Sequence, residues 1–143
     1  MLHRHPVLAL ITVAYLAFVG WLTLGPQPVD TAHDSWLWQL LRVLQQYDAT
    51  SWITYSRLEF GANMAMFFPV GLFFLLLLGR RYWWLSIFLA FALTAGIESA
   101  QLSIPGRVLD VRDIISNTTG GALGVFVGLI LTWRPTARST RTA

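Results

Sequence analysis

Apolar residues are gathered into four long runs along the chain, at residues 7–24, 60–78, 83–104 and 111–133. A helix needs about 20 mostly apolar residues to cross a bilayer, and each run is close to that length. The pair Arg80-Arg81 and a turn at Pro105-Gly106 separate the last three runs. The pattern predicts an all-α, polytopic membrane protein in which four transmembrane helices form a bundle, with both termini on the same side.

The connection at residues 25–58 is the only long one, and it contains a second helical pattern. Apolar residues recur there at helical spacing, at Trp36, Leu37, Leu40, Leu41, Leu44 and Tyr47. Glutamines and Arg42 occupy the opposite side. We therefore expect an outer amphipathic helix, which either lies in the membrane interface or packs over the ends of the spans as a lid.

One membrane domain is expected to cover residues 1–134, followed by a small, polar and basic tail at 135–143 that we expect to be disordered. The first apolar run follows a basic start, as it would in a signal peptide. The run is nevertheless long for the apolar part of a signal peptide, and no pair of small residues marks a cleavage site after it. We therefore expect it to be retained as a span.

The composition excludes a water-soluble enzyme. Apolar residues make up 55% of the chain and charged residues 12%, against roughly 45–50% and 25% in soluble domains. The absence of cysteine excludes disulfides, thiol nucleophiles and metal sites built on thiolates. The chain carries no phosphate loop, nucleotide fingerprint, zinc motif or serine elbow, and its three histidines lack metal-ligand spacing. The sequence predicts no cofactor and no metal site.

Arginines indicate the orientation of the bundle. Six of them lie on the face that holds the termini: Arg4, Arg80, Arg81, Arg134, Arg138 and Arg141. The opposite face carries the other four, with all seven acids there or in the outer part of a span. Positive residues favour the cytoplasmic side, so we expect both termini in the cytoplasm. The pI near 10 then reflects orientation, and no nucleic-acid partner is expected.

Polar residues are concentrated in the outer halves of the last three spans. Glu59 and Asn63 are four residues apart, and Glu98 and Gln101 are three apart, so each pair shares one helix face. A carboxyl group at the depth of Glu98 costs at least about 2.5 kcal/mol in lipid, and therefore must face protein, water or a partner. We predict one outward-facing polar cavity, with these candidate walls: Glu59, Asn63, Glu98, Gln101, Arg107, Asp110, Arg112, Asp113 and Asn117.

Each of these residues also has a purely structural interpretation. Asp113 is placed to cap the last span, and Asn117 to form a hydrogen bond between helices. Arg107 or Arg112 is placed to neutralise Glu98 in an ion pair.

Small residues recur every four positions on the last span, at Ser116, Gly120, Gly124 and Gly128. Such a stripe lets another helix approach closely, either inside the bundle or in a homo-oligomer. Gly61 and Gly96 are expected to serve close packing in the same way.

Three motifs in this chain resemble the VanZ-like family. They are Asn63-Met-Ala-Met-Phe-Phe-Pro69-Val-Gly71, Glu98-Ser-Ala-Gln101, and a third that runs from Gly106-Arg107 through Asp110, Asp113 and Asn117 to Gly120. The match covers residues 58–131. The resemblance implies a multi-pass protein of the bacterial cell membrane, in a family named for a protein that lowers susceptibility to the lipid-tailed glycopeptide antibiotic teicoplanin. It implies shared polar positions, without a reaction, at Asn63, Glu98, Gln101, Arg107, Asp110, Asp113 and Asn117.

Three functions fit these residues. The preferred one is a non-catalytic envelope protein, surrounded by membrane lipids, that binds an amphiphile such as a lipid-linked cell-wall precursor or a lipoglycopeptide. Arg107 and Arg112 would hold its phosphate or carboxylate. The second is a hydrolase or transferase acting on a lipid-linked or surface glycan headgroup, with Glu98 and Asp113 as the catalytic residues. The third is a scaffold that recruits another membrane protein through the glycine stripe.

Overall fold

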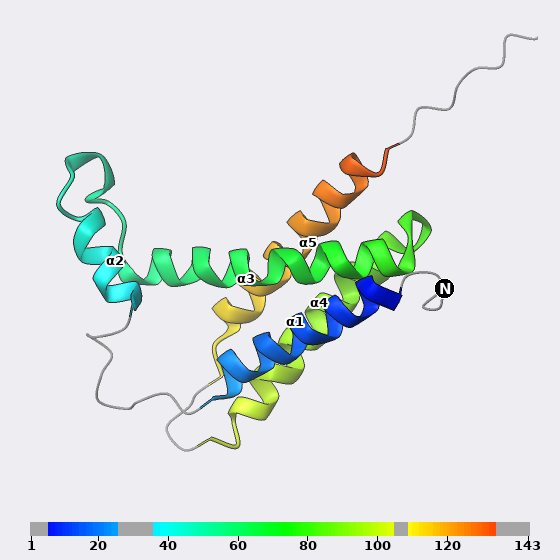
Figure 1. Cartoon of the computed structure of the whole chain (residues 1–143). Helices are drawn as coiled ribbons and strands as arrows, with labels where there is room; N and C mark the ends of the chain where they lie inside the picture. The colour runs from blue at the N-terminus through cyan, green and yellow to red at the C-terminus, as the bar shows by residue number, and fades with distance from the viewer. Residues whose placement is uncertain (1–5, 26–35, 105–108, 134–143) are drawn as a thin grey trace, which may run out of the picture.

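The computed structural model describes residues 6–25, 36–104 and 109–133, without the side chains of residues 36–38. Four helices in this part of the chain are long and apolar enough to cross a membrane. They are α1 (Pro6–Leu24), α3 (Tyr55–Leu78), α4 (Trp83–Gln101) and α5 (Val111–Leu131), and Figure 1 shows how they cross one another. The predicted all-α membrane fold is therefore confirmed. The predicted tail at 135–143 lies outside the described residues.

Helix α3 is the centre of the bundle, because α1, α4 and α5 all pack against it. Its buried side chains Phe67 and Val70 form a core with Val19 of α1 and with Ala90 and Ile97 of α4. Tyr15 of α1 donates a hydrogen bond of 2.8 Å to the carbonyl oxygen of Met66. The helix continues through Pro69, since packed neighbours make a proline tolerable inside a transmembrane helix.

Helices α3 and α5 form the most extensive helix pair, and glycines make their close contact. A β-carbon at Gly120 would overlap the carbonyl oxygen of Met64, and one at Gly124 would overlap that of Phe68. At Gly128, a β-carbon would lie 2.6 Å from the side chain of Leu75. The stripe on α5 is therefore packed within one chain, and a contact between protomers stays a prediction.

Gly61 and Gly96 do not serve this kind of packing. A β-carbon at either position would meet no atom within 4 Å, and both residues are exposed. The expectation that they bring helices together was wrong, because spacing along a helix does not show which side faces a neighbour.

The outer amphipathic helix is present as α2 (Trp36–Leu44), and the short 3-10 helix η3 (Asp48–Thr50) follows it. Leu41 is buried on the side of α2 that faces the protein, and α2 packs against α3. Figure 1 shows α2 at the far end of α3, away from α1, α4 and α5. It therefore does not cover the ends of those three spans.

The turn between α3 and α4 is tied to the end of α5. Gly79 has a φ of 86°, which glycine adopts without strain, and the 3-10 helix η4 (Arg80–Tyr82) follows. The Arg80 guanidinium donates hydrogen bonds to the carbonyl oxygen of Leu129 and, at 3.0 Å, to the hydroxyl of Thr132. A cation near a helix C-terminus stabilises the helix through its dipole.

Candidate functional site

The polar side chains of the spans meet at one end of the bundle. This end contains the start of α3, the end of α4 and the start of α5, which alternate in direction. Eight of the nine predicted residues are described there, and we call them the polar cluster: Glu59, Asn63, Glu98, Gln101, Asp110, Arg112, Asp113 and Asn117. The ninth, Arg107, lies outside the described residues.

Asn63 and Asp113 join α3 to α5 at the centre of the cluster. The amide nitrogen Nδ2 of Asn63 donates a hydrogen bond of 2.8 Å to Oδ1 of Asp113. Asn63 is eight residues into α3, about 12 Å from its start, so the bond lies below the end of the span. A hydrogen bond to a charged acceptor contributes about 1.5–3 kcal/mol. The pair therefore fixes where the Asp113 carboxylate stands.

Glu98 is held by the main chain just before α5. Its side chain is only 3% exposed, and its Oε2 accepts a hydrogen bond of 3.0 Å from the backbone nitrogen of Asp110. The Asp110 side chain caps α5 by accepting a bond of 2.8 Å from the backbone nitrogen of Arg112. Asp110 therefore caps α5, whereas the structural interpretation of the sequence assigned the cap to Asp113.

A second pair lies one turn deeper. Nδ2 of Asn117 donates a hydrogen bond of 2.9 Å to the hydroxyl of Thr94, and both residues are buried. Asn117 is four residues after Asp113, and Thr94 is four residues before Glu98, so each lies beneath a carboxylate on its own helix face. The predicted helix-to-helix role of Asn117 is therefore present. The spacing to Glu98 could have identified Thr94.

One oxygen in this deeper layer has no partner among the described residues. Oδ1 of Asn117 is buried and accepts no hydrogen bond there. Leaving a buried acceptor unpaired costs about 1–3 kcal/mol. The floor of the cluster can therefore accept a hydrogen bond from a donor that the described residues do not supply.

Gln101 connects the cluster to α1. Its Nε2 donates a hydrogen bond of 2.9 Å to the carbonyl oxygen of Thr23, next to the last residue of α1. The last carbonyls of a helix lack partners within the helix, which is why a glutamine side chain can bind one. No residue type in the sequence signals this main-chain partner, and α1 was not among the spans predicted to contribute to the site.

Negative charge dominates the electrostatics of the cluster. The Asp113 carboxylate interacts with three other acids, Glu98, Asp110 and Glu59. Arg112 interacts favourably with Glu59, while its guanidinium donates a hydrogen bond to the hydroxyl of Ser56. Arg112 is therefore bound to α3. From the sequence, we had considered it as an ion-pair partner for Glu98 of α4.

Exposure divides the cluster into a rim and a floor. Asp110 and Arg112 are exposed, whereas Glu98, Gln101 and Asn117 are buried. Between these levels, Glu59, Asn63 and Asp113 are partly buried. A molecule that approaches this end of the bundle meets the charged rim first. An open cavity between these side chains stays a prediction.

No group of three histidine, aspartate or glutamate side chains within the described residues is arranged to hold a metal ion. The carboxylates of the cluster instead accept hydrogen bonds from an amide side chain and from backbone nitrogens. Carboxylates held in this way are suited to hydrogen bonding and to proton transfer.

Comparison with known protein families identifies a match over most of the chain. The family described as VanZ/LLP1 matches residues 12–132, which include the whole polar cluster. No curated protein and no solved structure matches the chain.

Proposed function

We propose, starting from the fact that this chain belongs to the VanZ/LLP1 family, that it binds an amphiphilic molecule of the bacterial cell envelope at the polar cluster. The ligand is a lipid-linked cell-wall precursor or a lipoglycopeptide of the teicoplanin type, and it approaches from outside the cell. By binding the precursor or the antibiotic, the protein would lower susceptibility to the antibiotic. Both termini would then lie in the cytoplasm.

The observation that carries this proposal is the convergence of three spans on one polar end. Asn63 of α3 donates a hydrogen bond to Asp113 of α5, and Glu98 of α4 accepts one from the backbone nitrogen of Asp110. Ionisable groups in a membrane span are costly, and a bundle held only by packing does not need four acids close enough for their charges to interact. Their cost is explained if they recognise a ligand.

The arrangement suits a headgroup with its tail in the membrane. Arg112, and Arg107 in the connection before α5, would bind phosphate or carboxylate, because a guanidinium pairs with both oxygens of such a group. The unpaired oxygen of Asn117 would accept a hydrogen bond from the headgroup. The apolar tail would remain among the lipid-facing side chains of the bundle.

Binding of a labelled ligand to purified protein tests the proposal. The protein is placed in nanodiscs of neutral lipid, and a fluorescent lipid-linked precursor or labelled teicoplanin is titrated. Arg112→Ala or Arg107→Ala should weaken binding by about tenfold or more, since a charge-assisted hydrogen bond contributes about 1.5–3 kcal/mol. Arg42→Ala is the matched control, because Arg42 is an exposed arginine of α2 outside the cluster. Equal affinities in all four proteins would overturn the assignment of the site.

A second candidate function rests on the two carboxylates. Glu98 is buried and Asp113, which interacts with it electrostatically, is partly exposed. Carboxylates in such different surroundings can divide the roles of acid and base, as a hydrolase or transferase of a glycan headgroup requires. If the protein is such an enzyme, the wild type changes the composition of the envelope lipids and Glu98→Gln, expressed at the same level, does not. An unchanged lipid profile would exclude it.

A further inference from the structure

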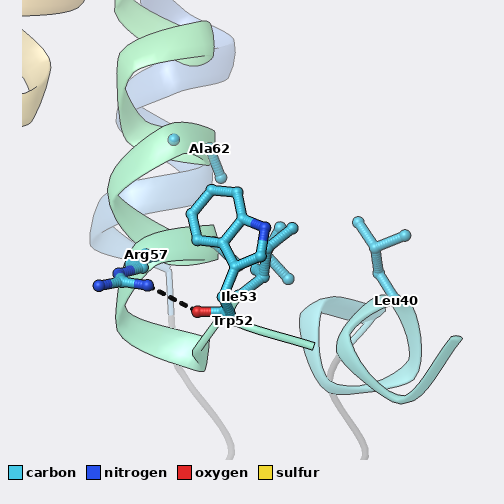
Figure 2. Close-up of a pocket in the computed structure, with 7 residues that line it drawn as sticks. Leu40, Trp52, Ile53, Arg57 and Ala62 are labelled. Atoms are coloured by element: carbon cyan, nitrogen blue, oxygen red, sulfur yellow. Dashed lines mark hydrogen bonds between the residues drawn. The ribbon is translucent and has the colours of Figure 1, made fainter. Parts of the chain in front are cut away.

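The structure holds a pocket of about 310 Å³ that is separate from the polar cluster. Its walls come from Leu40 of α2, from Trp52 and Ile53 before α3, and from Arg57, Gly61 and Ala62 of α3. Figure 2 shows the Trp52 indole directed along α3 toward Ala62, with Leu40 across from it on α2. The volume is within the usual range for ligand pockets, about 300–1,000 Å³.

Two residues that line the pocket lie on the face of α3 opposite the polar cluster. Successive residues of an α-helix are about 100° apart around the axis, so residues two positions apart are about 200° apart. Arg57 and Gly61 line the pocket, and each is two positions before a residue of the cluster, Glu59 or Asn63. The guanidinium of Arg57 is therefore a place for a headgroup separate from the polar cluster.

We propose that this pocket binds one anionic phospholipid, with an acyl chain between α2 and α3 and the phosphate at Arg57. Apart from Arg57, the lining residues are uncharged and mostly apolar, which suits a hydrocarbon chain. A β-carbon at Gly61 would meet no atom within 4 Å. The acyl chain of the lipid can thus lie against the main chain of α3 at Gly61.

Arg57 is positioned to hold the phosphate. One of its nitrogens donates a hydrogen bond of 2.6 Å to the carbonyl oxygen of Trp52, and its guanidinium lies 5.3 Å from the centre of the Trp52 ring. A guanidinium has five N–H donors, and the Arg57 side chain is exposed. This exposed side chain belongs to the first turn of a span, which is the level of lipid headgroups.

The charge of Arg57 selects the kind of lipid. No carboxylate is among the residues that line the pocket, so the guanidinium has no acid there to neutralise it. A basic residue near a membrane surface favours anionic lipids by about 1 kcal/mol, or about fivefold. A zwitterionic lipid gains less, because its own cation opposes the arginine.

Quenching of Trp52 by brominated lipid tests the proposal. The full chain is reconstituted in phosphatidylcholine vesicles that contain a fixed fraction of brominated phosphatidylglycerol or brominated phosphatidylcholine. The contribution of Trp52 is the difference in fluorescence between wild type and Trp52→Phe, since the chain has seven tryptophans. We expect about fivefold preferential quenching of Trp52 by the anionic lipid.

Two variants and a control separate the roles of charge and space. Arg57→Gln should remove the preference for the anionic lipid, and Gly61→Leu should reduce quenching by both lipids because it fills the pocket. Arg42→Gln, an exposed arginine of α2 that does not line the pocket, should keep the preference. Circular dichroism confirms that each variant retains its helices.

Equal quenching by the two lipids in the wild type would overturn the proposal, and so would an equal loss of preference in Arg42→Gln and Arg57→Gln. None of these outcomes bears on the polar cluster, whose ligand is measured separately.

Discussion

A single methyl group at Gly124 should separate the two most extensively packed helices. A β-carbon there would overlap the carbonyl oxygen of Phe68 and lie 2.9 Å from the backbone nitrogen of Leu72. Both atoms belong to the main chain of α3, which cannot rotate aside as the end of a side chain can. Gly124→Ala therefore forces α3 and α5 apart where they touch.

The size of the effect follows from this obstruction. Overpacking a core typically costs about 1–3 kcal/mol where side chains can adjust. Because main-chain atoms obstruct the methyl group here, we expect the free energy of unfolding to fall by about 3 kcal/mol. The intrinsic advantage of alanine over glycine in a helix, about 0.5–1 kcal/mol, offsets only part of that loss. Unfolding by SDS in mixed micelles, followed by circular dichroism, measures the change.

Gly96→Ala is the matched control. A β-carbon at Gly96 would meet no atom within 4 Å, so this variant should be unchanged or slightly more stable. If Gly124→Ala were as stable as Gly96→Ala, the close contact of α3 and α5 within one chain would be refuted. The oligomeric state of both variants should be measured in parallel, because the stripe was also predicted to join protomers.

Three further substitutions test the contacts that hold the bundle. Asn63→Leu leaves the Asp113 carboxylate without its donor from α3 and should lower the free energy of unfolding by about 1–3 kcal/mol; unchanged stability would contradict the bond. Arg80→Gln should destabilise the end of α5 by about 0.5–1.5 kcal/mol, because it removes hydrogen bonds to that end. Arg81→Gln should have no effect, and equal losses of stability in the two variants would contradict the hydrogen bonds assigned to Arg80. Tyr15→Phe removes a hydrogen bond from α1 to a carbonyl of α3 and should cost about 0.5–1.5 kcal/mol in the same SDS titration; no loss would indicate that this bond is not formed.

The four helices could be predicted because a span must be apolar over its whole length, and that requirement is visible in the sequence. The start of α3 was harder to place. The apolar run begins near residue 60, whereas the helix begins at Tyr55. Its first five residues include Ser56, Arg57 and Glu59, which hydropathy does not mark. Ser56 binds Arg112 of the rim, Glu59 belongs to the polar cluster, and Arg57 lines the pocket.

The members of the polar cluster were predictable, but most of their partners were not. Spacing places Glu98 and Gln101 on one face of a helix without showing what lies opposite. Their partners are a backbone nitrogen at Asp110 and a backbone carbonyl at Thr23. Every residue carries such groups, so no residue type signals them in a sequence. The α2–α3 pocket was missed because it depends on how a connection folds back on α3.

We propose that the polar cluster is a ligand site open to the outside of the cell. The chain has no cysteine, so a cysteine introduced at Asp110, an exposed residue of the rim, is the only thiol of the protein that a reagent can label. The direct measurement is the rate at which a membrane-impermeant maleimide labels Asp110→Cys in intact cells, with and without teicoplanin. Arg42→Cys serves as a control on the same face, which should be labelled at a rate that the antibiotic does not change. We expect Asp110→Cys to be labelled from outside the cell, at a rate that falls when teicoplanin is present. Labelling only after the membrane is opened, or at a rate that the antibiotic and a lipid-linked precursor leave unchanged, would contradict it.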